Sequence, residues 1–417
     1  MNPAPASTNT PPGIANVSPR IDLIDALRGF ALFGILLVHC GQWFAAAQLP
    51  RQVYEAQGGG VGNGISQTVI GIFFDGKFYT FFSFLFGLSF ALMLTRSTDS
   101  PGRFYGRFAW RLVVLGGIGL LHHMLWRGDI LSIYALVGFA LLPFGRLSNR
   151  VVLVVGLLLV TNVPTRIQVA YDTYLAPPKP KKPDSDNGDK EVVAYYKVVK
   201  EGNLRTLAGF NLAAFGEKMR FQVESGRIYI TLGFFLLGLY AGRRQLFQQF
   251  SRHKAWFRQR CRFTGFAVLA LTAIGVGLLA VFGNTKQPPA WAMTVFNVLY
   301  DLQSTCLTLF YITGLSLLWQ RPFWQKTVTA LASVGKVALS SYVGQSVVGT
   351  FLFFGYGLGL IGEIPLWQAA LLTFPIFAAQ IFLSRLWLKK FRYGPLEWLW
   401  RSATYLRVQP LRHTVSE

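Results

Sequence analysis

The chain has 417 residues, of which 52% are hydrophobic and only 14% are charged, and its formal net charge is +22. Soluble domains carry about 25% charged residues. The composition, with a mean hydropathy of +0.38, therefore argues against a soluble enzyme and for an integral membrane protein. The positive charge does not indicate a nucleic-acid partner, because the basic residues punctuate apolar stretches and do not gather with aromatic residues in one soluble module.

Ten apolar stretches approach the roughly 20 residues that a membrane-spanning helix needs. They cover residues 24–46, 76–95, 109–126, 130–145, 151–170, 228–241, 264–283, 291–319, 333–355 and 365–388. The stretches 130–145 and 228–241 are short, and we expect them to be tilted or broken. The expected fold class is all-α, a polytopic membrane helix bundle of about ten transmembrane helices.

The lysines and arginines predict the orientation of these spans. With the N-terminus placed inside and the spans alternating, 25 of the 40 basic residues fall in cytoplasmic segments, and five fall in short outside loops. The remaining ten lie in one long outside segment, residues 171–227, whose length weakens the positive-inside rule. An odd number of spans would move the basic C-terminus to the wrong side, so we expect both termini to be cytoplasmic.

The chain is expected to have five parts. Residues 1–20 are rich in Pro, Ser and Asn and lack the apolar core of a signal peptide, which predicts a disordered cytoplasmic tail. Residues 21–170 and 228–390 form two five-span halves on either side of the segment 171–227. Residues 391–417 form a cytoplasmic tail whose aromatic residues indicate an interfacial helix.

The outside segment differs in kind from the rest of the chain. Residues 171–227 hold eight of the 18 acidic residues and begin with a proline- and lysine-rich run. We expect a solvated extracytoplasmic loop with one surface helix at 190–207. The segment is either a linker or a lid over an outward-facing site.

The first span contains two ionisable residues, which are costly at membrane depth. Arg28 and His39 are eleven residues apart, about three helical turns, so both lie on one face and roughly 16 Å from each other. A guanidinium binds phosphate through a bidentate fork, and imidazole can accept a proton near neutral pH. The pair fits a site that receives a phosphate-bearing donor from the cytoplasm and reacts it deeper in the membrane. The alternatives are an interfacial anchor for Arg28, paired with Asp25 or Asp22, and a packing residue for His39.

Two further clusters lie at the outer ends of spans. Asp75 and Lys77 either form an interfacial cap, paired with each other, or line a cavity. Asp129 follows Gly128 in a tight outside turn, where it suits the N-cap of the next span. Alternatively, Asp129 lies with His122 or His123 at the outer mouth of the site. Adjacent histidines point to different helix faces, so they make a poor metal pair and we expect no metal.

Polar residues in the second half of the chain complete the candidates. Asp301 lies inside an apolar span, so we expect it to be buried against a partner. Gln345 belongs to a polar stripe that either hydrogen-bonds between helices or contacts a ligand. Glu397 and Arg401 have the i,i+4 spacing of a helical ion pair.

Two sequence patterns are weaker evidence about fold and function than the residues above. Residues 84–88 and 234–239 weakly echo each other, which indicates either duplicated halves or low complexity. The chain has no GxxxxGK[ST] phosphate loop, which argues against an ATP-driven pump. The glycine run at 58–64 lies outside by topology and follows no strand, so it is not a nucleotide loop.

Several stretches resemble the YeiB-like bacterial membrane family, which is defined by a domain of unknown function numbered 418. They are Asp25-Ala-Leu-Arg28-Gly, Phe84-Leu-Phe-Gly87, Gly128-Asp129-Ile-Leu, Ser341-Tyr342 with Gln345-Ser346, and Gly394-Pro395-Leu-Glu397 with Arg401. That family looks like a relative of the transmembrane acyltransferases, and the resemblance implies a bacterial inner-membrane protein. In acyltransferase-3 proteins an arginine and a histidine of the first span carry activity, at the spacing that Arg28 and His39 have here.

The leading hypothesis is a membrane-bound O- or N-acyltransferase. Acyl-CoA would enter from the cytoplasm, with its phosphates held by Arg28 and other inside arginines. His39 would deprotonate an acceptor, a sugar, polyol or lipid-linked molecule presented from the outer side. His122 and Asp129 would complete the catalytic set, and the substrate-binding candidates are Asp75, Lys77, Asp301, Gln345, Glu397 and Arg401. Expected partners are membrane lipids and possible further copies of the chain. The alternatives are a transporter or flippase that uses Asp301, Asp75 and Lys77 as a charge relay, and a non-catalytic scaffold.

Overall fold

The computed structural model describes residues 22–45, 49–56, 60–176, 186–283, 285 and 288–413. In these ranges the regular structure is helical, and the only bridge of β type joins Phe391 to Arg412. The all-α prediction is therefore confirmed. The predicted tail at 1–20 and the proline-rich run at 177–185 lie outside the described ranges.

The helices of the first half and of the long outside segment run as follows. They are α1 (Asp22–Val38, continued by a π-helical turn His39–Trp43), α2 (Arg51–Ala56), α3 (Val61–Phe73), α4 (Lys77–Arg96), α5 (Pro101–Leu125), α6 (Leu131–Leu141), α7 (Asn149–Val160), α8 (Val163–Tyr174), α9 (Asp186–Glu201), α10 (Leu204–Ala213) and α11 (Phe215–Glu224). The second half contains α12 (Arg227–Arg243), α13 (Phe250–Phe282), α14 (Ala290–Leu318), α15 (Pro322–Lys336), α16 (Ala338–Phe353), α17 (Leu366–Leu371), α18 (Thr373–Lys390) and α19 (Pro395–Tyr405).

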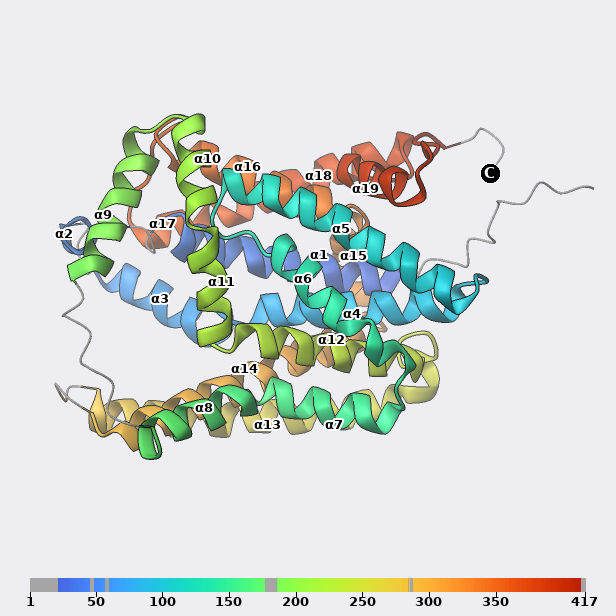
Figure 1. Ribbon diagram of the computed structural model, residues 1–417, viewed down its shortest axis with the longest axis horizontal. Coiled ribbons are helices and arrows are strands. Elements are labelled where there is room, and N and C mark those ends of the chain that lie inside the picture. The colour runs from blue at the N-terminus through green and yellow to red at the C-terminus, as the bar shows by residue number, and fades with distance from the viewer. Residues whose placement is uncertain are drawn as a thin grey trace, which may run out of the picture.

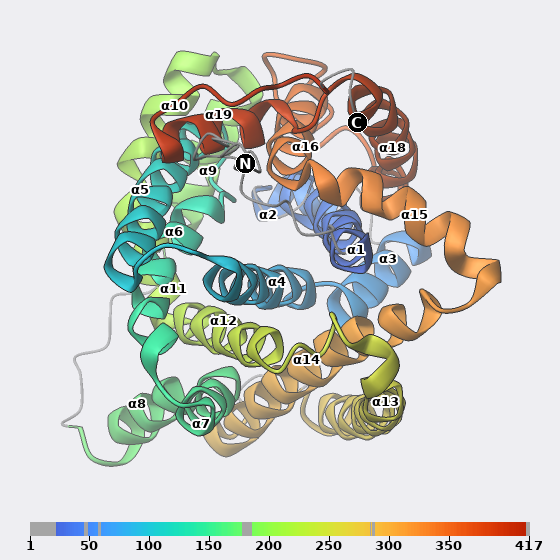
Figure 2. The same ribbon diagram turned by 90° about the vertical axis from the view of Figure 1, so that its right-hand side faces the viewer.

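Five helical stretches of the described chain are long and apolar enough to cross a membrane, and two bent pairs raise the number to seven. The five are Asp22–Trp43, Val61–Arg96, Pro101–Leu125, Phe250–Phe282 and Leu366–Lys390. The predicted span 151–170 is one of the bent pairs, because α7 and α8 meet at 48°. The helix α12, predicted at 228–241, has 17 residues and lies at the centre of the bundle, where α4 and α7 cover it (Figure 2).

Two expectations about the elements were wrong, and one helix was not expected. The predicted span 333–355 starts instead at Ala338, because residues 322–336 form the separate helix α15, which turns by 118° from α14 and packs on α1. The single surface helix expected at 190–207 is replaced by α9, α10 and α11. Helix α3 was not expected, because the polar and glycine residues at its start lower the mean hydropathy of that stretch.

The long helices run side by side, and their connections fall at two ends of the bundle (Figure 1). The connections α4–α5, α6–α7, α12–α13 and α18–α19 lie at one end, which we call the basic end. It carries Arg96, Arg103, Arg146, Arg150, Arg243, Arg244, Lys389 and Lys390. The connection α13–α14 and the helices α9 and α17 lie at the opposite end.

Close approach of glycines holds the centre of the bundle together. A Cβ at Gly87 of α4 would lie 1.9 Å from the carbonyl oxygen of Phe235 of α12, and one at Gly238 would lie 2.0 Å from that of Phe84. The segments 84–88 and 234–239 therefore pack against each other. Each contains a glycine that leaves space for the backbone of the other. Small residues at helix contacts are typical of bundles in membranes, where backbones must approach for dispersion contacts to stabilise the pair.

Gly87→Ala should loosen this contact, because its methyl group cannot fit against the backbone of α12. We expect a loss of about 1–3 kcal/mol in the free energy of unfolding, the usual cost of overpacking, measured by thermal unfolding in detergent. Gly117→Ala, on the face of α5 that has open space, is the control and should be neutral or slightly stabilising. Equal melting temperatures for the two variants would contradict the packing argument.

Candidate functional site

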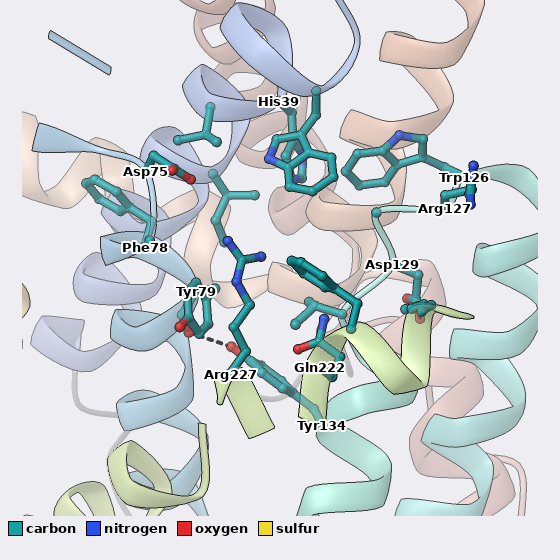
Figure 3. Close-up of a pocket in the computed structure, with 18 of the residues that line it drawn as sticks. His39, Asp75, Phe78, Tyr79, Trp126, Arg127, Asp129, Tyr134, Gln222 and Arg227 are labelled. Carbon is teal, nitrogen blue, oxygen red and sulfur yellow. Dashed lines mark hydrogen bonds and ion pairs between the residues drawn. The ribbon is translucent and has the colours of Figure 1, made fainter. Parts of the chain in front are cut away.

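A cavity of about 580 Å³ lies toward the end of the bundle opposite the basic end. Its walls come from the end of α1, the α3–α4 turn with the start of α4, the turn at 126–130, helix α11 and the start of α12, and single residues of α6, α9 and α16 complete the lining. In Figure 3, Asp75, Phe78 and Tyr79 face Trp126, Arg127 and Asp129 across the cavity, while Gln222 and Arg227 rise from a third side below His39. The cavity therefore collects residues that are about 300 positions apart in the chain.

His39 borders the cavity where α1 changes from α- to π-helical geometry. Such π-helical turns occur frequently at functional sites. The ring packs edge-on against Trp126, with 4.3 Å between centroids, and lies 5.9 Å from Phe44 and 6.3 Å from Tyr342. Its Nδ1 atom is buried and makes no hydrogen bond, while the residue keeps 9% exposure. The imidazole is thus held in place by rings and retains unused hydrogen-bonding capacity.

The turn that covers His39 depends on a glycine. The indole of Trp126 folds back over Gly128, where a Cβ would lie 2.3 Å from the ring. Tyr342 of α16 fixes the same turn, since its hydroxyl accepts from the N–H of Ile130 and donates to the carbonyl of Gly128, both at 3.3 Å. Only glycine permits this close packing, so the Gly128–Asp129 pair is the geometric reason that Trp126 reaches His39.

Asp129 is the most heavily bonded carboxylate near the cavity. One oxygen accepts from Nδ1 of His122 at 2.8 Å and from the N–H of Leu131 at 3.0 Å. The other accepts from the N–H and hydroxyl of Ser132, at 3.0 and 2.5 Å, and from Nζ of Lys218 at 3.2 Å. The predicted capping role is therefore present, and so is the predicted contact with His122.

The contact with Asp129 fixes the proton of His122. A carboxylate only accepts, so Nδ1 of His122 carries a hydrogen and donates it to Asp129. Nε2 is buried without a partner, and the ring lies 5.1 Å from that of Tyr342 and 6.2 Å from that of Trp126. His122 does not line the cavity and sits behind the two rings that hold His39. His123 bonds instead to the carbonyl of Asn211 at 2.9 Å and to Nζ of Lys218 at 3.3 Å, so it does not contact Asp129 directly.

Lys218 brings the outside segment into the site. It lies on α11, is nearly buried, and binds Ser132 and His123 as well as Asp129. Burial lowers the pKa of Lys218, against the opposing pull of Asp129. Burial by itself would raise the pKa of Asp129, but the hydrogen bond from His122 and the charge of Lys218 outweigh it and hold that pKa well below its ordinary value. A carboxyl group with a depressed pKa contributes stability that is lost only as the pH falls through that pKa. The ion pair of Lys218 with Asp129 therefore persists at neutral pH.

Other predicted residues lie apart from the cavity. Arg28 binds Asp25 at 2.6 Å and Ser89 of α4 at 2.7 Å. Lys77 is fully buried, with Nζ donating to the carbonyl of Gly71. Asp301 binds Arg166 and Asn162, and so has the partner that the sequence predicted.

Gln345 and Glu397 serve helix packing. The amide of Gln345 donates to the carbonyl of Leu32 and to Gln380, which places it between α1, α16 and α18. The expected ion pair of Glu397 with Arg401 was wrong. Glu397 instead accepts from the N–H groups of Leu339 and Ser340 and from the hydroxyl of Ser340, so it caps the start of α16. Free N–H groups at a helix start attract a carboxylate more strongly than an exposed i,i+4 partner does.

Sequence reasoning missed the cations that line the cavity, which are Arg127, Lys218, Arg220 and Arg227. Lys218 lies in a segment with nine other basic residues, and nothing in that context distinguishes it. Arg227 directly precedes an apolar stretch and therefore resembled an ordinary interfacial arginine. In the part of the chain that the structure describes, no group of three His, Cys, Asp or Glu side chains could hold a metal ion.

Lys218→Met should release α11 from the site, because it removes the ammonium that joins α11 to Asp129. We expect amide hydrogen exchange in residues 215–224 to become faster by about tenfold, the effect of losing a charged hydrogen bond of about 1.5 kcal/mol. The control is Lys197→Met, on the exposed side of α9, which should leave exchange in 215–224 unchanged. If both variants exchange alike, Lys218 does not hold the segment.

Known proteins resemble this chain over nearly its whole length. Residues 241–407 match the family model "Protein of unknown function (DUF418)". The uncharacterized protein YxaH of Bacillus subtilis (strain 168) is 28% identical, over 94% of this chain and 96% of its own length. The uncharacterized protein YeiB of Escherichia coli (strain K12) is 27% identical, over 93% of this chain and 97% of its own. The chain is therefore similar to YxaH and YeiB over nearly its whole length, and its C-terminal part matches the DUF418 family model.

Proposed function

We propose that the protein is a membrane-bound acyltransferase, which moves an acyl group from acyl-CoA to a hydroxyl or amine in the cavity. The observation that carries the proposal is His39. It is an imidazole on the cavity wall, held by Trp126, Phe44 and Tyr342, with ring nitrogen capacity that no protein group uses. Such a group is suited to take a proton from an acceptor, since its position is fixed before substrate arrives.

The proposed reaction has one proton transfer and one displacement. His39 takes the proton of the acceptor O–H or N–H, and the oxygen or nitrogen attacks the thioester carbonyl carbon. The C–S bond breaks, and the thiolate of CoA takes the proton back from His39. His122 and Asp129 act as positioning residues, because they hold the turn and the rings against which His39 rests.

Arginines at the basic end support acyl-CoA as the donor. The guanidinium of Arg111, on α5, lies 3.6 Å from the ring centre of Trp400, on α19. No carboxylate in the described ranges forms an ion pair with Arg111 or Arg401. Nε of Arg401 is buried without a hydrogen bond. The guanidinium groups of Arg111 on α5 and Arg401 on α19, which have no ion-pair partner in the described ranges, are therefore the ones that a polyphosphate could neutralise.

The proposal includes the topology. We infer about ten spans, both termini cytoplasmic, and the basic end facing the cytoplasm of a bacterial inner membrane. The gathering of arginine-rich connections at one end of the bundle supports this orientation. The cavity then lies in the outer half, so that donor and acceptor approach from opposite sides.

The transporter alternative has less support from the contacts. Asp301, Asp75 and Lys77 were its charge relay, but each is engaged separately, with Arg166, Tyr300 and the carbonyl of Gly71 respectively. Transport of an amphipathic metabolite or a lipid-linked sugar is therefore an outcome of the test and not a second proposal.

Replacing His39 with Ala or Gln should reduce acetyl transfer about 10²- to 10⁴-fold, the usual contribution of a general base. Purified protein would be given labelled acetyl-CoA and extracted bacterial envelope acceptors, and both product and bound acetyl-CoA would be measured. Acetyl-CoA binding should remain. His253→Asn, on α13, is the control and should transfer normally.

Two results would contradict this proposal. Unchanged turnover in the His39 variants would exclude His39 as the base. Absence of acetyl-CoA binding by the wild-type protein, together with uptake of a substrate into vesicles, would favour the transporter.

Arg111→Gln and Arg401→Gln test the donor site. Each should raise the KM for acetyl-CoA by about tenfold or more while leaving kcat nearly unchanged, because a lost phosphate contact removes uniform binding. Arg258→Gln, an exposed arginine of α13, should leave KM unchanged. If the KM of all three variants equals that of the wild type, the phosphates bind elsewhere.

A further inference from the structure

We propose that the cavity binds an amphiphile whose head carries a phosphate, and that Arg227 is the residue that recognises this phosphate. The proposal names the substrate class of the acceptor and to that extent rests on the proposed acyl transfer. Binding itself requires no acyl donor, so the two can be tested separately.

Arg227 stands at the start of α12 and extends into the cavity (Figure 3). Its guanidinium carbon lies 5.3 Å from the ring centre of Tyr79 and 5.3 Å from that of Phe221. These rings hold the side chain in place without neutralising it. Within the described ranges, the guanidinium forms no ion pair and no hydrogen bond with a protein group.

The other charges around the cavity are largely paired among themselves. Lys218 is bound to Asp129, and Arg127 is bound to Glu191 at 2.8 Å with Glu217 at 3.8 Å. Arg227 therefore lacks the carboxylate partner that Lys218 and Arg127 have. A half-buried guanidinium without a counter-charge is costly, and an anionic ligand would remove that cost.

The groups beside Arg227 suit a phosphate. A guanidinium binds two oxygens of one phosphate through parallel N–H bonds. The buried amide of Gln222 also lines the cavity and makes no hydrogen bond within the described ranges, so it offers further donors. Arg220, which directly precedes Phe221 and Gln222 in α11 and also lines the cavity, adds a second positive charge without an ion-pair partner in those ranges.

The rest of the cavity suits an apolar chain. Its remaining lining includes Ile35, Val38, Trp43, Phe74 and Phe78. A volume of about 580 Å³ lies in the range of roughly 300–1,000 Å³ that accommodates ligands of this size. His39 borders the same space, so a hydroxyl near the phosphate would be presented to it.

The test measures binding of three matched probes to the purified full chain in non-ionic detergent, without acyl-CoA. The probes are dihexanoyl phosphatidic acid, which has head and tail, dihexanoylglycerol, which has only the tail, and glycerol 3-phosphate, which has only the head. We expect the phosphatidic acid to bind most tightly. Arg227→Gln should weaken it by about tenfold to a hundredfold, the effect of losing a bidentate charged contact, and Arg227→Lys should weaken it less.

The control is Arg205→Gln, an exposed arginine of α10 that does not line the cavity, and it should bind all probes as the wild type does. Melting temperatures without ligand show whether each variant is folded. If the wild-type protein transfers no acyl group but binds phosphatidic acid in an Arg227-dependent way, the proposed function fails and this inference stands.

Other outcomes overturn the inference in whole or in part. If dihexanoylglycerol binds as tightly as phosphatidic acid, or if folded Arg227→Gln binds it normally, phosphate recognition by Arg227 is wrong. If glycerol 3-phosphate binds as tightly as phosphatidic acid, the phosphate site stands and the amphiphile is wrong, which would point to a free phosphorylated acceptor.

Discussion

The carboxylate of Asp129 holds together the part of the structure on which the candidate site depends. A buried carboxylate is costly unless every lone pair is satisfied, and here α5, α6 and α11 all contribute donors. The same contacts close the turn at 126–130 and place the indole of Trp126 on His39. The charge of Asp129 thus joins helix α11, from the segment 171–227, to the bundle and shapes a wall of the cavity.

The molecule separates two kinds of polar group along its length. Guanidinium groups gather at the basic end, where Arg111 lies over Trp400 and Arg28 is tied to Asp25. Imidazole groups with unused nitrogens lie toward the other end, beside the cavity. The proposed acyl transfer would use this division, with phosphates held at the basic end and the base beside the acceptor.

Much of the fold followed from the sequence because hydropathy and charge are local properties. The apolar runs predicted most long helices, and the alternation of arginines agrees with the two ends of the bundle. The bend between α14 and α15 could not be predicted, because α15 gains its stability by packing on α1. At this contact Gly335 has no side chain and so leaves space for the carbonyl oxygen of Asp25. The sequence likewise singled out His39, His122 and Asp129, since ionisable residues in apolar runs are rare. It missed Lys218 and Arg227, whose roles come only from tertiary contacts.

A structure of the protein in lipid nanodiscs with a thioether analogue of acetyl-CoA would test the central claim most directly. The account predicts the acyl carbon of the analogue beside His39, within the cavity, and the phosphates of CoA against Arg111 and Arg401 at the basic end. A nucleotide bound at the opposite end, or an acyl group outside the cavity, would contradict it.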